Sequence, residues 1–87
     1  MSKDVIVYTK PHEDGFCAQC KFVKTYLNSK VIEFDEIEGS VPGVADMLKE
    51  KGFKSYPVTH VKSQDLFIIG FDRKTLDEYV SDLENNK

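Results

Sequence analysis

An 87-residue chain that is 40% hydrophobic and 31% charged has the size and composition of one small globular domain, with no room for a second. Its net charge of −3 argues against a general nucleic-acid binder, which would carry a basic face. No apolar run approaches the roughly 20 residues that cross a membrane, and the first residues lack the pattern of a secretory signal peptide. We therefore expect a cytoplasmic monomer with neither a nucleic-acid nor a membrane partner.

The first half of the chain predicts two strands with a helix between them. Val5–Tyr8 is a continuous apolar run, which is typical of a strand buried on both faces. From Cys17 to Asn28 apolar side chains recur every three or four positions, which predicts a helix. Val31–Ile37 then alternates apolar and acidic residues, as a half-buried strand does.

The second half predicts two helices and a hairpin. Ser40 is a candidate N-cap for a helix that ends at Gly52. The apolar stripe of this helix is Val41, Val44, Ala45 and Leu48. Pro57–Val61 and Leu66–Ile69 are two strands joined by a polar turn. Asp72 is a candidate N-cap for the last helix.

The predicted order is β-α-β-α-β-β-α, an α/β fold with a four-stranded mixed sheet and three flanking helices, in one domain over residues 1–87. The first β-α-β unit predicts parallel strands joined by a crossover, and the hairpin supplies antiparallel ones. Each helix has one apolar stripe, so the helices should cover the sheet. We expect the first strand near the centre and Val31–Ile37 at an edge.

Both cysteines lie at the start of the first predicted helix, in the motif Cys17-Ala18-Gln19-Cys20. The free N–H groups and partial positive charge of a helix N-terminus favour a thiolate, so the pKa of Cys17 should be lowered. Lys10 and Lys21 are near in sequence and would add positive potential. Cys20 lies one turn further, on the face that meets the sheet, and should be more buried and less reactive.

The cysteine pair has three readings. A structural disulfide is disfavoured, because the cytoplasm is reducing and the loop it would close is very short. A zinc site wants four ligands, and the other soft ligands are His12, in the loop, and His60, near the far end of the hairpin strand. A redox pair is favoured, because C-x-x-C here begins a helix in a β-α-β unit.

Two other segments stand out. Tyr56-Pro57 opens the hairpin strand, where proline is tolerated, and lies close to the cysteine helix in this fold. A cis bond there would aim backbone groups at a substrate, although cis X–Pro bonds are a minority. Gly70 permits a tight turn, and Phe71 is either a core residue or an exposed contact for a partner.

Together these residues resemble the thioredoxin superfamily, and within it the small glutaredoxin and NrdH-redoxin branch. The resemblance covers nearly the whole chain. It rests on Val7-Tyr8-Thr9, Cys17-Ala18-Gln19-Cys20, Tyr56-Pro57-Val58 and Gly70-Phe71-Asp72. The C-A-Q-C motif is close to the C-V-Q-C of NrdH-redoxins, whereas Gln19 differs from the proline in the C-G-P-C of thioredoxin. The Gly70-Phe71 pair before the last helix is similar to that of NrdH-redoxins and phage glutaredoxins.

The resemblance implies a thioredoxin-like fold and a dithiol-disulfide oxidoreductase. Cys17 would be the nucleophile, Cys20 the resolving thiol, and Pro57 a cis-proline. No cofactor would be bound, and electrons would come from NADPH through thioredoxin reductase or through glutathione. The partner would be ribonucleotide reductase, whose active-site disulfide must be reduced again in each turnover. The substrate-binding residues would be Lys10, Phe16, Tyr56, Pro57, Gly70, Phe71 and Asp72.

The chain departs from this branch at two places. The loop from Lys10 to Phe16 is longer than in most glutaredoxins and NrdH-redoxins, although some phage glutaredoxins share this length. Arg73 stands where glutaredoxins usually carry a second acidic residue, which favours the NrdH-like reading over a glutathione site. Two alternatives stay open: a module that holds a metal ion or an iron–sulfur cluster between subunits, and a catalytically idle thioredoxin-like adaptor.

Overall fold

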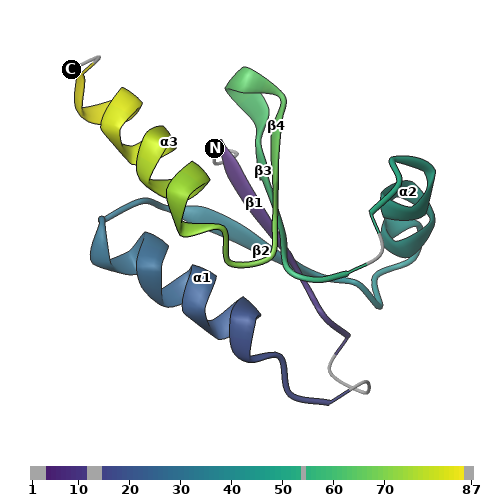
Figure 1. Cartoon of the computed structure of the whole chain (residues 1–87). Coiled ribbons are helices and arrows are strands. Elements are labelled where there is room, and N and C mark those ends of the chain that lie inside the picture. The colour runs from purple at the N-terminus through teal and green to yellow at the C-terminus, as the bar shows by residue number, and fades with distance from the viewer. Residues whose placement is uncertain (1–3, 12–14, 54, 86–87) are drawn as a thin grey trace.

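The computed structural model of the chain describes residues 4–11, 15–53 and 55–85. Its elements, in chain order, are β1 (Val5–Thr9), α1 (Ala18–Ser29), β2 (Phe34–Glu38), α2 (Val44–Glu50), β3 (Val58–Val61), the short 3₁₀ turn η2 (Lys62–Gln64), β4 (Leu66–Ile69) and α3 (Arg73–Asn85). The predicted order of strands and helices is therefore confirmed (Figure 1).

The four strands form one mixed sheet in the order β2-β1-β3-β4. β1 runs parallel to β2, with Val5 opposite Phe34, and antiparallel to β3, with Val5 opposite Val61. β3 and β4 form the predicted antiparallel hairpin. The first strand lies inside the sheet and the second at its edge, as expected.

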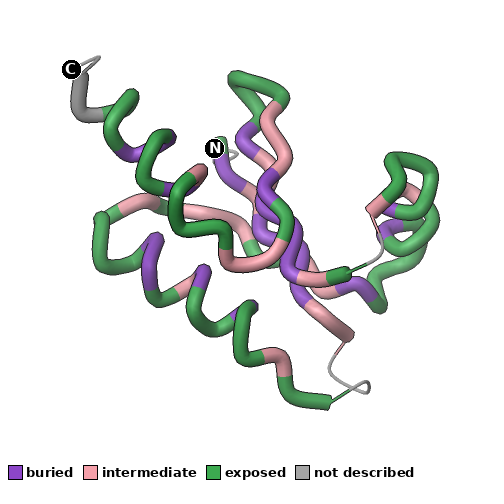
Figure 2. Tube along the Cα trace, viewed as in Figure 1, coloured by how far each residue is buried: buried purple, intermediate pink, exposed green. Residues whose placement is uncertain are grey.

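The helices cover both faces of the sheet and so create two cores. α1 and α3 lie on one face and α2 lies on the other (Figure 1), and the buried segments of Figure 2 line the contact between each helix and the sheet. The core under α1 and α3 consists of Val5, Val7, Val23, Tyr26, Leu27, Val61, Ile68, Leu76, Tyr79 and Val80. The smaller core under α2 consists of Tyr8, Val44, Leu48 and Val58.

The second strand begins later than its sequence pattern predicts, at Phe34 instead of Val31. Val31 has a φ of 57°, and its N–H donates to the carbonyl of Asn28 over 3.0 Å. The N–H of Ile32 donates to the carbonyl of Leu27 over 2.9 Å. This pair of hydrogen bonds is the Schellman arrangement that closes a helix C-terminus. Val31 and Ile32 therefore belong to the end of α1 and not to the strand.

Ser40 is not the N-cap of α2, so that prediction is wrong. Its hydroxyl donates to Glu38 Oε1 over 3.1 Å, and the chain turns through Val41 before the helix starts. Gly43, with a φ of 88°, occupies the N-cap position without a side-chain hydrogen bond. Val41 is 45% exposed and lies outside the helix.

The other predicted helix ends are confirmed. Gly52 has a φ of 87° and follows the end of α2, where the N–H of Phe53 donates to the carbonyl of Leu48 over 2.9 Å. Asp72 precedes α3, and its carboxylate accepts hydrogen bonds from the N–H and the hydroxyl of Thr75. Among the described residues, no helix has the length and the apolar character that crossing a bilayer would require.

Candidate functional site

Cys17 and Cys20 are joined by a disulfide, with their Cα atoms 5.3 Å apart. Cys17 is the N-cap of α1, and its Sγ accepts a hydrogen bond from the N–H of Cys20 over 3.2 Å. Cys17 is partly exposed, whereas Cys20 is only 4% exposed. The predicted difference in burial is therefore confirmed: Cys20 is buried and Cys17 is not.

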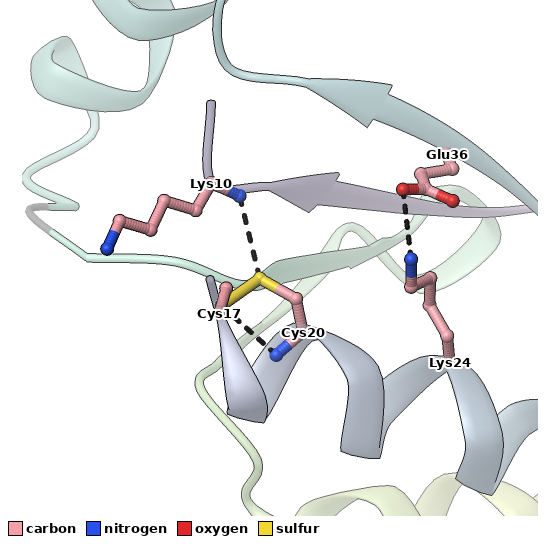
Figure 3. A network of polar contacts seen from close by, with 5 residues as sticks. All are labelled: Lys10, Cys17, Cys20, Lys24 and Glu36. Carbon is pink, nitrogen blue, oxygen red and sulfur yellow. Dashed lines mark hydrogen bonds and ion pairs between the residues drawn. A yellow bond between two sulfur atoms is a disulfide. The ribbon is translucent and has the colours of Figure 1, made fainter. Parts of the chain in front are cut away.

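The main chain supplies a second hydrogen bond to the sulfurs. β1 ends at Thr9, and the N–H of the next residue, Lys10, donates to Cys20 Sγ over 3.5 Å. Figure 3 shows that this donor is the backbone nitrogen and that the side chain of Lys10 extends away from the disulfide. The end of the central strand therefore faces the buried sulfur.

An ion pair ties the cysteine helix to the edge strand. Lys24 Nζ lies 3.1 Å from Glu36 Oε2, with the two side chains 33% and 46% exposed; Figure 3 shows the pair beside the disulfide. Exposed pairs of this kind contribute little to stability. The pair orients the Lys24 side chain toward β2.

Two grooves meet at Cys17. One, of about 650 Å³, also contains Cys20, Lys21 and Lys24. The other, of about 630 Å³, contains Gln19, Ser55 and Tyr56. Lys10 and Phe16 line both grooves, and Phe16 is 77% exposed. The structure thus places three of the predicted substrate-binding residues, Lys10, Phe16 and Tyr56, in grooves that Cys17 also lines.

Pro57 and Gly70 lie next to this site. The Tyr56–Pro57 peptide bond is cis, and the carbonyl of Pro57 accepts the N–H of Gly70 over 2.8 Å. Gly70 has a φ of 69°, and a Cβ there would lie 2.9 Å from Gln19 Oε1. A side chain at position 70 would therefore be strained by the positive φ, and the end of the exposed Gln19 side chain would have to shift to make room for it.

Phe71 and Asp72 are close in sequence to this site but line neither groove at Cys17. Phe71 is partly buried, with its ring centroid 5.8 Å from that of Phe22 and 6.2 Å from that of Tyr26, so it packs against α1 at the border of the larger core. Asp72 is exposed, and its hydrogen bonds from the hydroxyl and the N–H of Thr75 hold the pKa of its carboxyl below the ordinary value.

Gly39 is a residue of the site that sequence reasoning missed. It is buried at the end of β2, and its N–H donates to the carbonyl of Thr9 over 2.8 Å. A Cβ at Gly39 would lie 2.6 Å from Cζ of the Tyr56 ring, so the ring occupies the space that a side chain would take. The φ of Gly39 is not in the left-handed region, and the Gly39-Ser40 pair indicates only a turn, so nothing in the local sequence indicates the contact with Tyr56.

The structure does not bring His60 to the cysteines. His60 lies opposite Ile6 on β1, whereas the disulfide lies beyond the other end of that strand, next to Lys10. The His60 ring stacks on Phe67 with a centroid distance of 4.1 Å, and Nε2 is 3.1 Å from Asp65 Oδ1. His12, the other histidine considered for a zinc site, and residues 13–14 of the long loop lie outside the described residues. The described residues contain no group of three or more His, Cys, Asp or Glu side chains that could hold a metal.

Comparison with known proteins supplies the context for this geometry. No protein-family model matches the chain, and no curated protein matches it. Among solved structures, NrdH-redoxin from Escherichia coli, a glutaredoxin-like protein with a thioredoxin-like activity profile, is similar with a TM-score of 0.74 and 27% identity, covering 85% of this chain and 91% of that one. A glutaredoxin from Brucella melitensis has a TM-score of 0.65 and 30% identity, over 97% of this chain and 87% of that one.

A third structure extends the likeness of fold. Glutaredoxin from Archaeoglobus fulgidus has a TM-score of 0.66 and 20% identity, covering 87% of this chain and 84% of that one. Three findings point to the same family. They are the four-stranded mixed sheet, the disulfide at the start of α1, and the likeness to these solved structures. The chain belongs to the glutaredoxin and NrdH-redoxin branch of the thioredoxin superfamily, and it is a dithiol oxidoreductase.

Proposed function

We propose that the chain reduces protein disulfides, with Cys17 as the nucleophile and Cys20 as the resolving thiol. The observation that carries this assignment is the inequality of the two sulfurs. Cys17 is partly exposed and lines two grooves, and its Sγ accepts a hydrogen bond from the N–H of Cys20 at the helix N-terminus. Cys20 is 4% exposed. Donors and a partial positive charge at a helix start favour a thiolate, and a thiolate must be reachable to attack.

The reaction passes through a mixed disulfide. The Cys17 thiolate attacks one sulfur of the substrate disulfide; a bond forms between them, the substrate S–S bond breaks, and the departing sulfur takes up a proton. Cys20 then gives up its proton and attacks Cys17 Sγ, which forms the Cys17–Cys20 disulfide and releases the second substrate thiol. Two electrons have passed from the dithiol to the substrate.

The proposed acceptor is ribonucleotide reductase, and the proposed electron source is NADPH, through thioredoxin reductase or through glutathione. Support comes from the likeness to NrdH-redoxin, described as glutaredoxin-like with a thioredoxin-like activity profile. Further support comes from Arg73, which stands after Asp72 where glutaredoxins usually carry a second acidic residue. Lys10, Phe16 and Tyr56 would contact the substrate chain in the groove at Cys17. The protein would work as a monomer in the cytoplasm.

Single replacements of the two cysteines test the roles. Cys20→Ser should trap a mixed disulfide with an oxidised protein substrate, visible as a mass shift that dithiothreitol removes. Cys17→Ser should abolish disulfide reduction and form no such adduct. If Cys17→Ser keeps the activity of the unmodified chain, or if it is the variant that traps substrate, the two roles are assigned wrongly.

The reductant is tested by supplying each electron source in turn. The oxidised chain is mixed with NADPH and either thioredoxin reductase or glutathione with glutathione reductase, and NADPH consumption is followed. We expect the thioredoxin reductase system to be the faster, and the reduced chain to sustain turnover of ribonucleotide reductase while Cys17→Ser does not. Failure of both systems to reduce the disulfide would contradict the proposed electron source.

A further inference from the structure

We infer that Gly39 is a positioning residue for disulfide reduction. Because it has no side chain, it lets the Tyr56 ring lie against its backbone and form one wall of the groove at Cys17. This inference rests on the proposed function, because it concerns the groove that would hold the substrate. The observation behind it is the close approach of the Tyr56 ring to the Gly39 backbone, where a Cβ would lie 2.6 Å from Cζ and 3.0 Å from Cε1. Contacts under 3.0 Å to a Cβ require one of the two groups to move.

The ring, and not the Gly39 backbone, is the group that would move. Gly39 follows the last residue of β2, and Glu38 is paired with Thr9 of β1. The N–H of Gly39 also donates to the carbonyl of Thr9 over 2.8 Å. Lys10, which directly follows Thr9, in turn donates its N–H to Cys20 Sγ. Hydrogen bonds therefore hold the backbone at Gly39 to β1 and the end of β1 to the cysteine helix, so the Gly39 backbone has little freedom to move.

The Tyr56 ring has space into which it can be displaced. Tyr56 lines both the groove at Cys17, of about 630 Å³, and a smaller hollow of about 250 Å³ beside α2. Ser55 lines both spaces with it. A ring pushed off Gly39 would enter one of these two spaces and either narrow or widen the groove, so the substrate chain would meet a displaced wall.

Gly39 has no conformational reason to be glycine. Gly15, Gly43, Gly52 and Gly70 have positive φ values, whereas Gly39 does not. Alanine is therefore compatible with the backbone at position 39, and the consequence of Gly39→Ala is expected to come from the Tyr56 ring. The variant should fold, and its defect should lie in substrate binding and not in the chemistry of the thiol.

The test is a double-mutant cycle between positions 39 and 56, with the reduction of insulin disulfides as the reaction. Gly39→Ala should raise KM by about tenfold, less than the roughly 100-fold cost of a 1 Å misplacement at a reacting centre, with kcat changed much less. In the Tyr56→Ala background the same replacement should leave KM unchanged, because the ring that it displaces is absent. Ser40→Ala, in the same turn and exposed, is the matched control and should behave like the unmodified chain.

A second readout separates positioning from general damage. The pH profile of iodoacetamide alkylation at Cys17 in the reduced protein should be the same with and without Gly39→Ala, because alkylation needs only the thiolate. An unchanged KM in Gly39→Ala, or an equal rise in KM in the Tyr56→Ala background, would overturn the inference. If the unmodified chain reduces no disulfide at all, the proposed function fails instead, and the two failures are thus distinguishable.

Discussion

Thr59 is a polar residue in an apolar place. It lies on β3 opposite Val7 and Ile68, both members of the core under α1 and α3, and paired residues in a sheet point to the same face. Its side chain is 1% exposed, and no hydrogen-bond partner for its Oγ1 is found among the residues that the structure describes. A buried hydroxyl without a partner lowers stability.

Thr59→Val should therefore stabilise the fold. Valine has nearly the same shape and removes the unpaired group, so we expect a gain of about 1 kcal/mol in the free energy of unfolding, or about 4–8 °C in Tm for a chain of this size. Urea or thermal unfolding measures it. Thr75→Val is the matched control and should not gain, because the hydroxyl of Thr75 donates to Asp72. A loss of stability in Thr59→Val would show that the hydroxyl has a partner in solution.

Asp72 predicts a dependence of stability on pH. Hydrogen bonds from the hydroxyl and the N–H of Thr75 lower the pKa of its carboxyl from the ordinary value of 3.8. A lowered folded-state pKa means that the contribution is fully present above about 3.8 and disappears as the pH falls through the folded-state value. Asp72→Ala should therefore have a lower Tm than the unmodified chain at pH 7, and the difference should shrink below pH 3.8.

Asp72→Asn is the control for this pH effect. Asparagine keeps an acceptor at the N-cap but cannot titrate, so the difference in Tm between Asp72→Asn and Asp72→Ala should stay constant through the acid range. The contrary result is a Tm difference between Asp72→Asn and Asp72→Ala that shrinks in acid as much as the Tm difference between the unmodified chain and Asp72→Ala does. That result would show that the Asp72 carboxylate does not cause the pH dependence.

At the scale of the elements, the C-terminus of α1 contains a residue that its conformation disfavours. Val31 has a φ of 57° and is 89% exposed, so it has the strain of a β-branched residue in the left-handed region without the benefit of burial. Val31→Asn should raise the stability by about 1 kcal/mol, because asparagine adopts this conformation more readily. Val41→Asn, at an exposed valine without positive φ, should not stabilise. Denaturant unfolding that shows no gain for Val31→Asn would contradict the strain argument.

Most of the elements could be predicted from the sequence, and the errors have physical causes. β4 was placed residue for residue, because its apolar run is bounded by the polar turn and by Gly70. The sequence pattern predicts that β2 begins at Val31, because Val31 and Ile32 have high strand propensity. Hydrogen bonds at the end of α1 decide the conformation of these two residues instead. Ser40 has the composition of an N-cap, but the turn through Val41 delays the helix.

The candidate site shows the same division. Cys17 and Cys20 could be found from their spacing and their place in the order of elements, because a C-x-x-C motif carries its geometry within one helical turn. The contact of the Tyr56 ring with Gly39 could not be predicted, because it joins residues from different segments and because Gly39 has no positive φ that would mark it. Contacts of this kind depend on how β2 and the Tyr56–Pro57 segment meet in space.

At the scale of the whole molecule, the two faces of the sheet differ in how much they bury. α2 spans seven residues, with Val44 and Leu48 buried, and packs on the smaller core. α1 and α3 cover the opposite face together and share the larger core (Figure 2). Short helices with few buried residues unfold locally at low free energy.

Native-state hydrogen exchange should therefore find α2 opening before the rest of the fold. We expect the amides of Val44–Glu50 to exchange at a free energy well below that of global unfolding, and the amides of β1 and β3 to exchange only with it. Leu48→Ala should widen this gap, while Leu27→Ala, in the larger core, should lower the stability of all elements together. Amides in α2 that are protected as strongly as those in β3 would contradict this ranking.

Both described hydrogen bonds to the sulfurs come from the main chain: the N–H of Lys10 reaches Cys20, and the N–H of Cys20 reaches Cys17. Every amino acid except proline carries such a donor. The two hydrogen bonds of the redox pair are therefore independent of which non-proline side chain occupies position 10, so substitutions there can change the lining of the grooves at Cys17 while leaving these bonds in place. Only a change that moves the backbone itself, or a proline at position 10, would remove the bond to Cys20.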